Sequence, residues 1–567
     1  MGATKNILAA ILMFLIFLMI PGYLELIGLG PSDDGEATKI IEPVVENNGV
    51  VSENTTIHKT NTHNQVPGKN IHVITDLFDA TISSRGGGSL VEYKLIAEDD
   101  GNFKYMGSYD NDGAYNENSP VLLNYDLLDM GCSPCLSVDN KETLLNQSFN
   151  LITNLNNDTL YLRGNEKLEL NYRYENNLGD FVEKQMVFYG DSYKINSRFD
   201  FNLSNTYPNK NIEISWLSGI MPAELMENDE LTYSSAYISL NGDLESITQS
   251  SVDGVSLEIY DKVKTDWFAL RNKFFTISIV PEEPSDFSTL SSNNINLGNR
   301  KVTPIYNASL GYEMNSGVLS FKTYLGPLDT KHINEFDSEL QLIMNFGWII
   351  IQPFSKLVLW FLKTLHNSIG INYGLILILL AFIMRIVTGP LTKKSYESSV
   401  KMKVVAPLQK AIQEKYKNDP QKLQQEMGKL WKEHGFNPAM SCIAPLLQMP
   451  LLMSFFIVFR STVEFRGQPF ILWITDLSQP DYIFDLPFSV PLYGSAVAVL
   501  PILMGISMFL TMRVSMQSAE DSQKYMMYFM NGFFVLIFNT FPSGLTLYYT
   551  VYNFLSFQQQ LSIKKNS

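Results

Sequence analysis

The feature that most constrains this chain is a series of long apolar segments, one near the N-terminus and five after residue 370. Lipid offers no hydrogen-bond partners to a peptide backbone, so a segment that crosses it must form a helix or part of a closed barrel. About 20 mostly apolar residues are enough for a helix to cross the hydrocarbon layer. We therefore predict an α-helical membrane bundle of six transmembrane helices, over residues 7–29, 373–389, 442–463, 493–512, 525–541 and 543–557.

The first of these segments, residues 7–29, has two interpretations. A cleavable signal peptide would also place an apolar run near the N-terminus. This run is longer than the apolar part of a usual signal peptide, and no small-x-small cleavage site closes it cleanly. We therefore expect an uncleaved transmembrane anchor over residues 1–30. A flexible linker rich in Asn, Thr, Glu, Gly and Ser should follow over residues 31–70.

Residues 71–340 follow a different pattern. Short stretches in which apolar and polar residues alternate are separated by clusters of Asn, Gly and Asp, as in Lys167–Glu175, Tyr193–Leu203, Val255–Tyr260 and Val318–Tyr324. Alternation with a period of two is typical of antiparallel strands with one buried face. The segment is also long enough to bury a full core. We predict an all-β sandwich domain here.

The segment 341–370 is apolar and aromatic, but Gln352, Pro353, Lys356 and Lys363 interrupt it. It contains tryptophans, which favour the boundary between membrane and water. We expect an amphipathic helix that lies on the membrane surface. A broken transmembrane helix is the alternative.

The distribution of charge indicates the topology. The chain has a net charge of −16, yet from residue 341 onward it carries 19 basic and 11 acidic side chains. The 391–440 loop is basic and the 464–492 loop is acidic. Because cytoplasmic loops are enriched in Lys and Arg, we expect both termini in the cytoplasm and the β domain outside it. The acidity of the β domain argues against binding of nucleic acid there.

Arg385 is the one charged residue within the 373–389 segment. An arginine at the centre of a membrane helix costs about 2.5–3.5 kcal/mol on insertion scales, so it needs a partner, water or a route to the surface. Arg385 is close enough to the cytoplasmic end of the segment to reach the lipid headgroups. The functional alternative is an arginine that faces a water-filled cavity between helices and attracts acidic or polar substrate segments.

The basic loop 391–438 has the composition of a helical hairpin. Lys393 to Lys417 favours a helix, Asp419 and Pro420 are a natural N-cap and first residue for a second helix, and Gly435 is a natural stop. Contact with lipid headgroups explains its lysines in part. The sharper hypothesis is a docking site for incoming chains or their delivery machinery, through Lys393, Lys394, Lys401, Lys403, Lys410 and Lys415.

Polar residues are few within the other predicted spans. In membrane helices such residues most often serve packing, so each alone is weak evidence of function. A shared hydrophilic groove would give a joint purpose to Gln448, Thr546, Tyr548 and Tyr549.

Cys132 and Cys135 form a Cys-Ser-Pro-Cys motif in the acidic half of the chain. The motif is compatible with a local disulfide if that half lies outside the cytoplasm, with half of a redox motif, or with two free thiols. No second CxxC and no nearby His supports a metal site, and we expect neither a metal nor another cofactor.

No catalytic motif was found: GxSxG, HExxH and the P-loop are all absent from the sequence. We therefore expect a protein that is not an enzyme. A solute transporter would predict paired intramembrane charges and repeated halves, neither of which the sequence has. A membrane-bound enzyme with its site in the β domain would need clustered acids or histidines, which one sequence does not exclude.

Several motifs together resemble one family. They are Phe382–Thr392, Asn437-Pro438, Pro445–Pro450, Phe541–Gly544 and Leu547–Tyr549, and their order and spacing resemble the YidC-type membrane protein insertases. This family includes the mitochondrial oxidase-assembly and chloroplast thylakoid insertases. The β domain resembles the periplasmic domain of the Gram-negative members in Ser84–Gly87, Trp267 and Leu325–Pro327.

The resemblance implies an insertase and chaperone of the bacterial inner membrane, with its large domain in the periplasm. A five-helix core over residues 371–563 would form a hydrophilic groove that is open to the cytoplasm and the lipid, and Arg385 matches the family's arginine. A short basic tail would follow over 564–567. The implied partners are nascent membrane proteins, the Sec translocon, a ribosome or the signal recognition receptor, and the lipid bilayer.

Overall fold

The computed structural model describes residues 68–566, apart from 100, 111, 127–131, 139–141, 144–147, 209, 249–255, 299, 335–338, 348, 418, 436–437 and 516–520. The predicted anchor and nearly all of the predicted linker lie outside the described residues. Two units are separated within the described chain, a β-rich unit that ends at Met344 and a helical unit that begins at Asn345. Each unit is described by itself.

The β-rich unit is built on three large sheets. The first sheet has the strand order β12 (Thr159–Tyr161), β1 (Asn70–Ile74), β2 (Phe78–Ser83), β3 (Ser89–Leu95), β8 (Leu122–Tyr125). The second has the order β10 (Glu142–Thr143), β9 (Cys135–Val138), β16 (Ile212–Trp216), β23 (Arg300–Tyr312), β22 (Phe287–Leu297), β19 (Ser256–Tyr260). The third has the order β11 (Asn150–Leu151), β13 (Lys167–Glu175), β14 (Phe181–Tyr189), β15 (Lys194–Asn202), β24 (Ser316–Pro327), β21 (Phe275–Pro281), β20 (Thr265–Arg271), β17 (Ser235–Leu240), β18 (Asp243–Ile247).

The smaller elements of this unit are two short hairpins and three helical turns. They are β4 (Glu98–Asp99) with β5 (Asn102–Phe103), β6 (Met106–Tyr109) with β7 (Tyr115–Pro120), α2 (Glu227–Leu231), α3 (Thr330–Ile333) and the 3-10 helix Glu339–Ile343.

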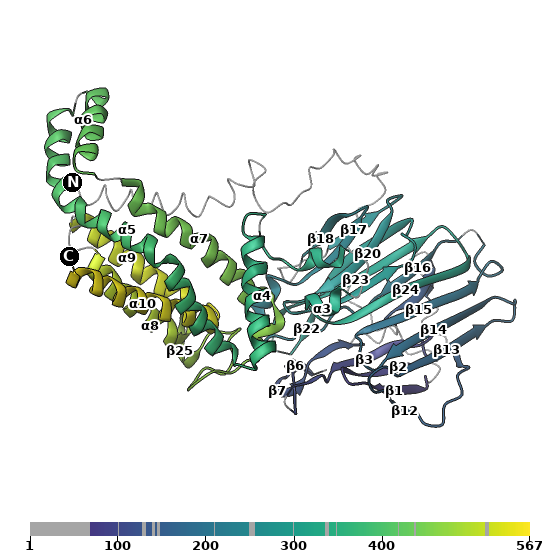
Figure 1. Ribbon diagram of the computed structural model, residues 1–567. Helices are drawn as coiled ribbons and strands as arrows, with labels where there is room; N and C mark the ends of the chain where they lie inside the picture. The colour runs from purple at the N-terminus through teal and green to yellow at the C-terminus, as the bar shows by residue number, and fades with distance from the viewer. Residues whose placement is uncertain are drawn as a thin grey trace. The chain divides into compact units, whose positions relative to one another are not determined.

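The sheets pack in layers around an aromatic core (Figure 1). In β14, buried and partly exposed residues alternate along the whole strand, as the sequence predicts for a strand with one buried face. Phe188 of β14 meets Phe78 of β2 with ring centroids 6.5 Å apart, and the hydroxyl of Tyr93 donates to the carbonyl oxygen of Leu325 at 3.1 Å. The predicted antiparallel arrangement is confirmed for the described strand pairs except β1 with β12, which is parallel.

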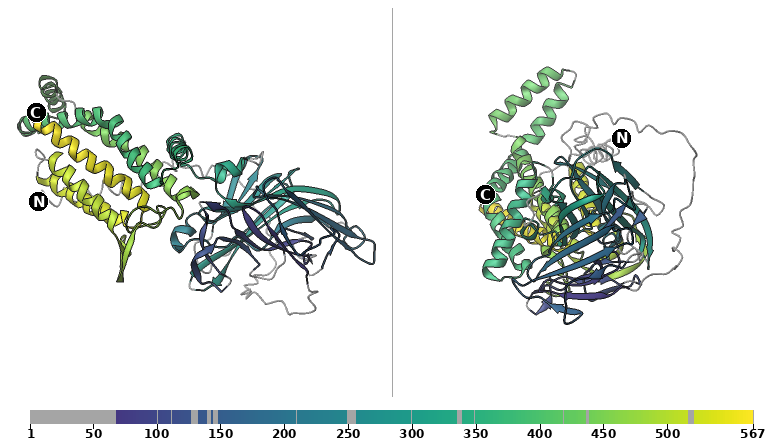
Figure 2. Two further views of the ribbon diagram at one scale, coloured as in Figure 1. Left: turned by 60° about the horizontal axis from the view of Figure 1, so that its bottom comes forward. Right: turned by 90° about the vertical axis from the view of Figure 1, so that its right-hand side faces the viewer.

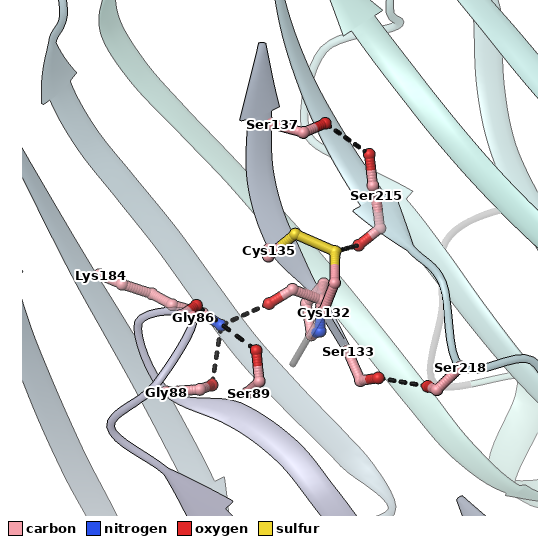
Figure 3. The surroundings of a disulfide bond; sticks show 11 residues. Gly86, Gly88, Ser89, Cys132, Ser133, Cys135, Ser137, Lys184, Ser215 and Ser218 are labelled. Carbon is pink, nitrogen blue, oxygen red and sulfur yellow. Dashed lines mark hydrogen bonds between the residues drawn. A yellow bond between two sulfur atoms is a disulfide. The ribbon is translucent and has the colours of Figure 1, made fainter. Parts of the chain in front are cut away.

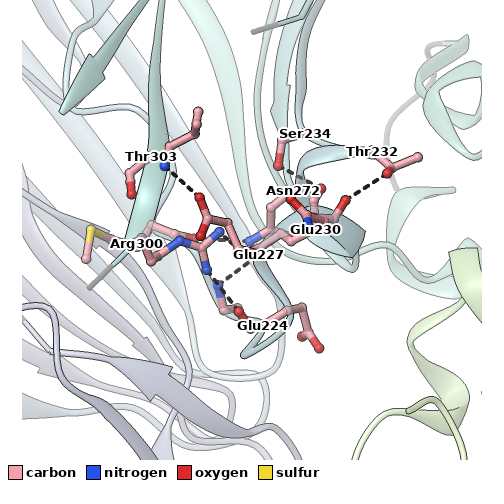
Figure 4. A network of polar contacts seen from close by, with 12 residues as sticks. Glu224, Glu227, Glu230, Thr232, Ser234, Asn272, Arg300 and Thr303 are labelled. Atoms are coloured by element: carbon pink, nitrogen blue, oxygen red, sulfur yellow. Dashed lines mark hydrogen bonds and ion pairs between the residues drawn. The ribbon is translucent and has the colours of Figure 1, made fainter. Parts of the chain in front are cut away.

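A buried ionic network supports the loops around α2 (Figure 4). Arg300 pairs with Glu230 at 3.0 Å, and both side chains are almost fully buried. Arg300 also donates to the carbonyl oxygen of Glu224 at 2.9 Å, while Glu230 accepts from the backbone N–H of Ala223 at 2.8 Å. Burial raises the pKa of Glu230 to about 7, and the nearby Arg300 opposes this rise.

The helical unit contains seven helices among its described residues. They are α4 (Gln352–Ile369), α5 (Tyr373–Lys415), α6 (Pro420–Glu433), α7 (Pro438–Ser461), α8 (Val499–Ser515), α9 (Asp521–Phe538) and α10 (Ser543–Asn566). Helix α10 packs against both α5 and α8, α9 packs on α8, and α7 packs on α4 and α5. A 3-10 turn (Val463–Phe465) and the hairpin of β25 (Tyr482–Val490) with β26 (Gly494–Ala498) lie between α7 and α8.

The predicted helix on the membrane surface corresponds to α4, which is shorter than the predicted segment. Pro353 lies in its first turn, where the missing N–H of proline does no harm, and Gly370 ends it in a left-handed conformation with φ of 69°. The structure therefore has one continuous helix over this part of the predicted segment, with Phe354, Leu357 and Trp360 exposed.

The predicted span 493–512 starts too early. The structure has β26 up to Ala498 and starts α8 at Val499. Two side chains from elsewhere in the sequence set this boundary. Asn539 donates to the carbonyl oxygens of Tyr493 and Ala496, each at 2.7 Å, and Asp481 accepts from the backbone N–H of Val499 and Leu500 at 3.2 and 2.8 Å. These contacts keep the first residues extended and cap the helix.

The number of spans is not confirmed. Among the described residues, one helical segment is long and apolar enough to cross a membrane, Tyr373–Lys394. Pro450–Ser461 of α7, Val499–Val514 of α8 and Lys524–Phe538 of α9 are shorter apolar stretches among those residues. Helix α10 is long, but its Thr, Asn and Gln residues reduce its hydropathy.

Candidate functional site

Arg385 lies in α5 and faces α10. Asn372 caps the start of α5, and its side chain accepts from the backbone N–H of Gly374 at 2.8 Å. Three turns later Arg385 is only 8% exposed, and its Nη2 donates to Oε1 of Gln559 on α10. Nε2 of Gln559 in turn donates to the carbonyl oxygen of Gly389 at 3.4 Å. A single amide therefore joins the arginine to the backbone one turn further along α5.

Gly389 leaves room for the side-chain amide of Gln559. A Cβ atom at this position would lie 3.1 Å from Nε2 of Gln559, which is closer than ordinary van der Waals contact. Tyr552 completes the cluster, with its ring centroid 5.7 Å from the guanidinium carbon of Arg385 and its hydroxyl 3.1 Å from Oγ1 of Thr388. An aromatic face at this distance attracts a cation.

The cluster opens onto a pocket of about 440 Å³. Within the described part of the chain, no carboxylate lies within ion-pair distance of Arg385. The pocket therefore has a positive potential that no described anion cancels, and it can attract an acidic or strongly polar segment. Its lining consists of Arg385, Ile386, Gly389, Pro390, Lys393 and Gln559.

Three other predicted groove residues, Thr546, Tyr548 and Tyr549, do not line this pocket. All are buried, and Gln559 lies roughly 15 Å further along α10 than Tyr549. Oγ1 of Thr546 bonds back to the carbonyl oxygens of its own helix, and the ring of Tyr548 packs on Phe455 of α7 at 4.2 Å. The structure thus places them in helix packing. The side chain of Gln448 lies outside the described residues.

The hydroxyl groups of Tyr548 and Tyr549 are polar groups that a hydrophilic groove would use. Both are buried, and neither has a hydrogen-bond partner among the residues that the structure describes. A buried hydroxyl without a partner is costly in an apolar setting. Their part in a groove stays a prediction.

The C-terminal part of α5 and the whole of α6 form the predicted basic hairpin. Figures 1 and 2 show the two helices side by side. Asp419 caps α6 by accepting from the backbone N–H of Lys422 at 3.1 Å. Val405 and Leu430 form a small core between the helices, with Ile412 and Trp431 against it. Pro407 lies within α5, and the helix continues past it to Lys415.

The lysines of the hairpin form an exposed basic surface. Lys393, Lys394, Lys410 and Lys415 are exposed. The ammonium groups of Lys415 and Lys422 lie 5.4 and 5.6 Å from the ring centroid of Tyr416. The side chains of the predicted docking residues Lys401 and Lys403 lie outside the described residues. That this surface docks a partner stays a prediction.

Cys132 and Cys135 are buried and joined by a disulfide in the structure (Figure 3). The buried ammonium group of Lys184 donates to the carbonyl oxygens of Pro134 in the same loop and Gly88, at 2.7 and 2.8 Å. Burial lowers the pKa of Lys184 to about 7. The geometry suits a structural role, and the oxidation state in the cell stays a prediction.

The sequence interpretation missed Gln559, Tyr552 and Gly389. Gln559 belongs to a run of three glutamines that directly follows the last predicted span, residues 543–557. An uncommon amide near the end of an apolar segment was the available signal. Nothing in the sequence alone pairs it with Arg385, because 174 residues separate them.

Two family models match the chain in sequence. Residues 139–360 match the YidC periplasmic domain, and residues 364–567 match the 60Kd inner membrane protein family. These matches define an inner-membrane protein that carries a periplasmic domain.

Curated relatives extend the match. The chain is 35% identical to the membrane protein insertase YidC of Chlorobium luteolum over 416 residues. This aligned region covers 72% of this chain and 71% of the relative. It is 33% identical over 512 residues to the same-named protein of Pelodictyon phaeoclathratiforme, covering 88% and 83%. The chain belongs to the YidC family of membrane protein insertases, whose named function is not enzymatic.

A solved structure is also similar. It is described as an active YidC insertase with the first transmembrane domain resolved, is 18% identical, and covers 88% of this chain and 94% of its own. Its TM-score is 0.32, so the family assignment rests on the sequence matches.

Proposed function

We propose that this protein inserts membrane proteins into the inner membrane and assists their folding, with the pocket around Arg385 as the site that receives the polar part of a client. The observation that carries this proposal is a buried arginine held by a neutral amide rather than by an acid. A carboxylate partner would cancel its charge. Gln559 fixes the position of the guanidinium group and leaves its charge available to a client.

The physical task of an insertase is to move a polar flanking segment through hydrocarbon. The idealised cost of taking an ion from water into a medium of low dielectric is on the order of 20 kcal/mol. An open pocket between α5 and α10 brings a fixed positive charge close to the apolar path, and this charge offsets part of that cost for acidic segments. No nucleotide is needed for this step.

The client's apolar segment needs a separate route into lipid. Helix α9 presents Tyr525, Met526, Met527 and Phe529 as exposed side chains. Methionine and aromatic side chains form adaptable apolar surfaces. We assign to this face and to α7 the release of the client into the bilayer, driven by burial of apolar surface.

The arrangement in the membrane is part of the proposal. Helices α5, α7, α8, α9 and α10 cross the inner membrane. Both termini and the hairpin of α5 and α6 lie in the cytoplasm. Helix α4 lies at the periplasmic surface of the inner membrane. The exposed lysines then face the cytoplasm, where a ribosome or the signal recognition receptor would deliver a client. The protein acts alone or beside the Sec translocon.

The test is a depletion assay in cells. The protein is depleted, and protease protection is measured for a small client with a short translocated segment. Re-expression of wild-type protein should restore protection, whereas Arg385→Glu should not. Arg513→Glu is the matched control, since Arg513 is an exposed arginine in the last turn of α8. Normal insertion during depletion would contradict the proposed function, and full rescue by Arg385→Glu would contradict the role of the pocket.

A further inference from the structure

The β25–β26 hairpin displays apolar side chains that the described protein does not cover. Ile483, Phe484, Phe488 and Leu492 are all exposed. Figures 1 and 2 show the hairpin protruding from the helices. A surface that covers these side chains would add hydrophobic stabilisation to the hairpin.

The turn of the hairpin contains a leucine in a backbone conformation that is unfavourable for leucine. Leu492 has a φ of 68° and is 64% exposed. Left-handed turn positions favour Gly, Asn or Asp, and a leucine there gains nothing locally. Leu472, in the preceding part of the same connection, repeats the pattern with a φ of 60° and 83% exposure. Two exposed leucines in unfavourable conformations indicate that the side chains themselves are needed.

Strand β26 and the turn before it are held by Asn539, which directly follows α9. The side chain of Asn539 donates to the carbonyl oxygens of Tyr493 in the turn and Ala496 in β26, and it accepts from the backbone N–H of Ala498. Asp481 accepts from Nε1 of Trp473 at 2.8 Å and so ties the preceding loop to the start of α8. The apolar side chains are thus presented in a fixed place at the end of the bundle.

We infer that the β25–β26 hairpin is a second membrane anchor, which inserts the side chains of Ile483, Phe484, Phe488 and Leu492 into the lipid surface at the non-cytoplasmic end of the bundle. This inference rests on the membrane arrangement proposed above. The patch continues into α8, which starts one residue after β26 and exposes Ile502, Leu503 and Ile506.

Charge favours lipid acyl chains over an acidic or basic partner. Residues 482–498 contain no Lys or Arg, and Asp485 is their one acidic residue. Attraction to anionic headgroups therefore contributes little, and the hydrophobic effect supplies the binding. The contact should not weaken when salt is raised, because salt screens charges and not apolar burial.

The test compares three probes in the full-length protein. Cys442→Ser removes the unpaired cysteine, and Leu492→Cys, Ile506→Cys and Leu178→Cys each receive an environment-sensitive fluorophore. The proteins are placed in bilayer discs that contain lipid with a spin-label quencher on its acyl chains. Leu178 is the matched control, because it is also a leucine in a turn with 64% exposure but belongs to the β-rich unit.

We expect the probes at 492 and 506 to be quenched severalfold more than the probe at 178. Quenching at 506 but not at 492 would overturn the hairpin inference and leave the proposed function intact. Quenching at neither position would overturn the membrane arrangement as well. A probe at 492 that is shielded from water but not quenched would show that protein, a second copy or a client, covers the hairpin, and would also overturn the inference.

A second variant separates anchoring from folding. Leu492→Asn suits the left-handed turn better than leucine does. We expect it to leave thermal stability unchanged or higher and to reduce the quenching of a probe at Phe488→Cys. Unchanged quenching at 488 would contradict the part assigned to Leu492.

Discussion

At the scale of single residues, the proposed function depends on which partner Arg385 has. Gln559 donates one hydrogen bond to the backbone of α5 and accepts one from the arginine. Hydrogen bonds to charged groups contribute roughly 1.5–3 kcal/mol, so the pair is held firmly while the positive charge remains. The amide is therefore a positioning group and not a counter-ion.

Replacing Gln559 by Glu should trap the arginine in an internal ion pair. A client would then have to compete with that pair. We expect insertion of a client with an acidic segment to fall by about 5- to 30-fold, which corresponds to one or two kcal/mol. The measurement is protease protection in proteoliposomes, with thermal unfolding measured in parallel.

The matched control is Gln560→Glu, a buried neighbouring amide in the same helix that does not line the pocket. If Gln559→Glu inserted clients as well as wild type while remaining folded, the free charge of Arg385 would not be what clients use.

Lys184 gives a prediction about pH. Burial lowers its pKa from 10.5 to about 7 in the folded protein. Between these two values the unfolded state binds more protons, so this group makes folding more stable as pH rises, by up to about 1.4 kcal/mol per unit. We expect the unfolding midpoint of the β-rich unit to rise more steeply from pH 7 to 9 in wild type than in Lys184→Met. Equal slopes would contradict a depressed pKa.

The sequence identified Arg385 but not its surroundings. A charge in an apolar segment is visible locally, because the cost of burying it is high wherever the helix packs. Gln559, Gly389 and Tyr552 matter only because α5 and α10 meet, which sequence spacing does not show. Thr546, Tyr548 and Tyr549 are buried in helix contacts away from the pocket of Arg385, and their part in a groove stays a prediction.

At the scale of elements, local signals predicted the basic hairpin well. Asp419 was expected to cap the second helix, and its side chain does so. Replacing Asp419 by Ala should cost about 1 kcal/mol in the stability of α6. Hydrogen exchange of the α6 amides should become faster, while exchange in α10 stays unchanged. Unaltered exchange in α6 would contradict the capping role.

The buried ionic network around α2 leads to a prediction of a larger effect on stability. Replacing Arg300 by Met removes the partner of buried Glu230, which should destabilise the β-rich unit by roughly 3–5 kcal/mol. Adding Glu230→Gln should restore part of this loss, because no uncompensated charge is then buried. The measurement is thermal unfolding of the full-length variants at neutral pH. A double variant no better than Arg300→Met would contradict the ion-pair explanation.

The hairpin of β25 and β26 shows what local patterns miss. The sequence assigned residues 493–498 to a span because they are apolar and uncharged. Their extended conformation depends on Asn539, which is more than 40 residues away, and on pairing with β25. Short apolar runs fit a strand or a helix equally well by periodicity alone, so the tertiary contact decides.

At the scale of the whole molecule, sequence patterns separated the acidic β-rich unit from the basic helical unit. The described chain divides between Met344 and Asn345, close to the predicted boundary at 340. The layered sheets were also predictable in kind, since alternation fixes which face is buried. Strand order was not, because neighbours such as β15 and β24 are distant in sequence.

The number of spans remains a prediction for experiment at this scale. Helix α7 spans 24 residues, α8 spans 17, and α10 is long but carries Thr, Asn and Gln residues. The proposed arrangement places the α5–α6 hairpin and the α7–α8 connection on opposite sides of the membrane. Cysteines at Lys429 and Ser495 should therefore react with impermeant reagents from opposite sides, and labelling from one side would contradict the arrangement.

The most direct test of the central claim is a charge exchange between client and pocket. A client with an acidic translocated segment is followed with wild-type protein and with Arg385→Glu, and then a client in which those acids are changed to lysine is followed with both. The account predicts that Arg385→Glu impairs the acidic client and restores or improves the lysine client relative to wild type. Equal impairment of both clients would mean that Arg385 serves the fold of the bundle, and it would contradict the claim that its charge receives the client.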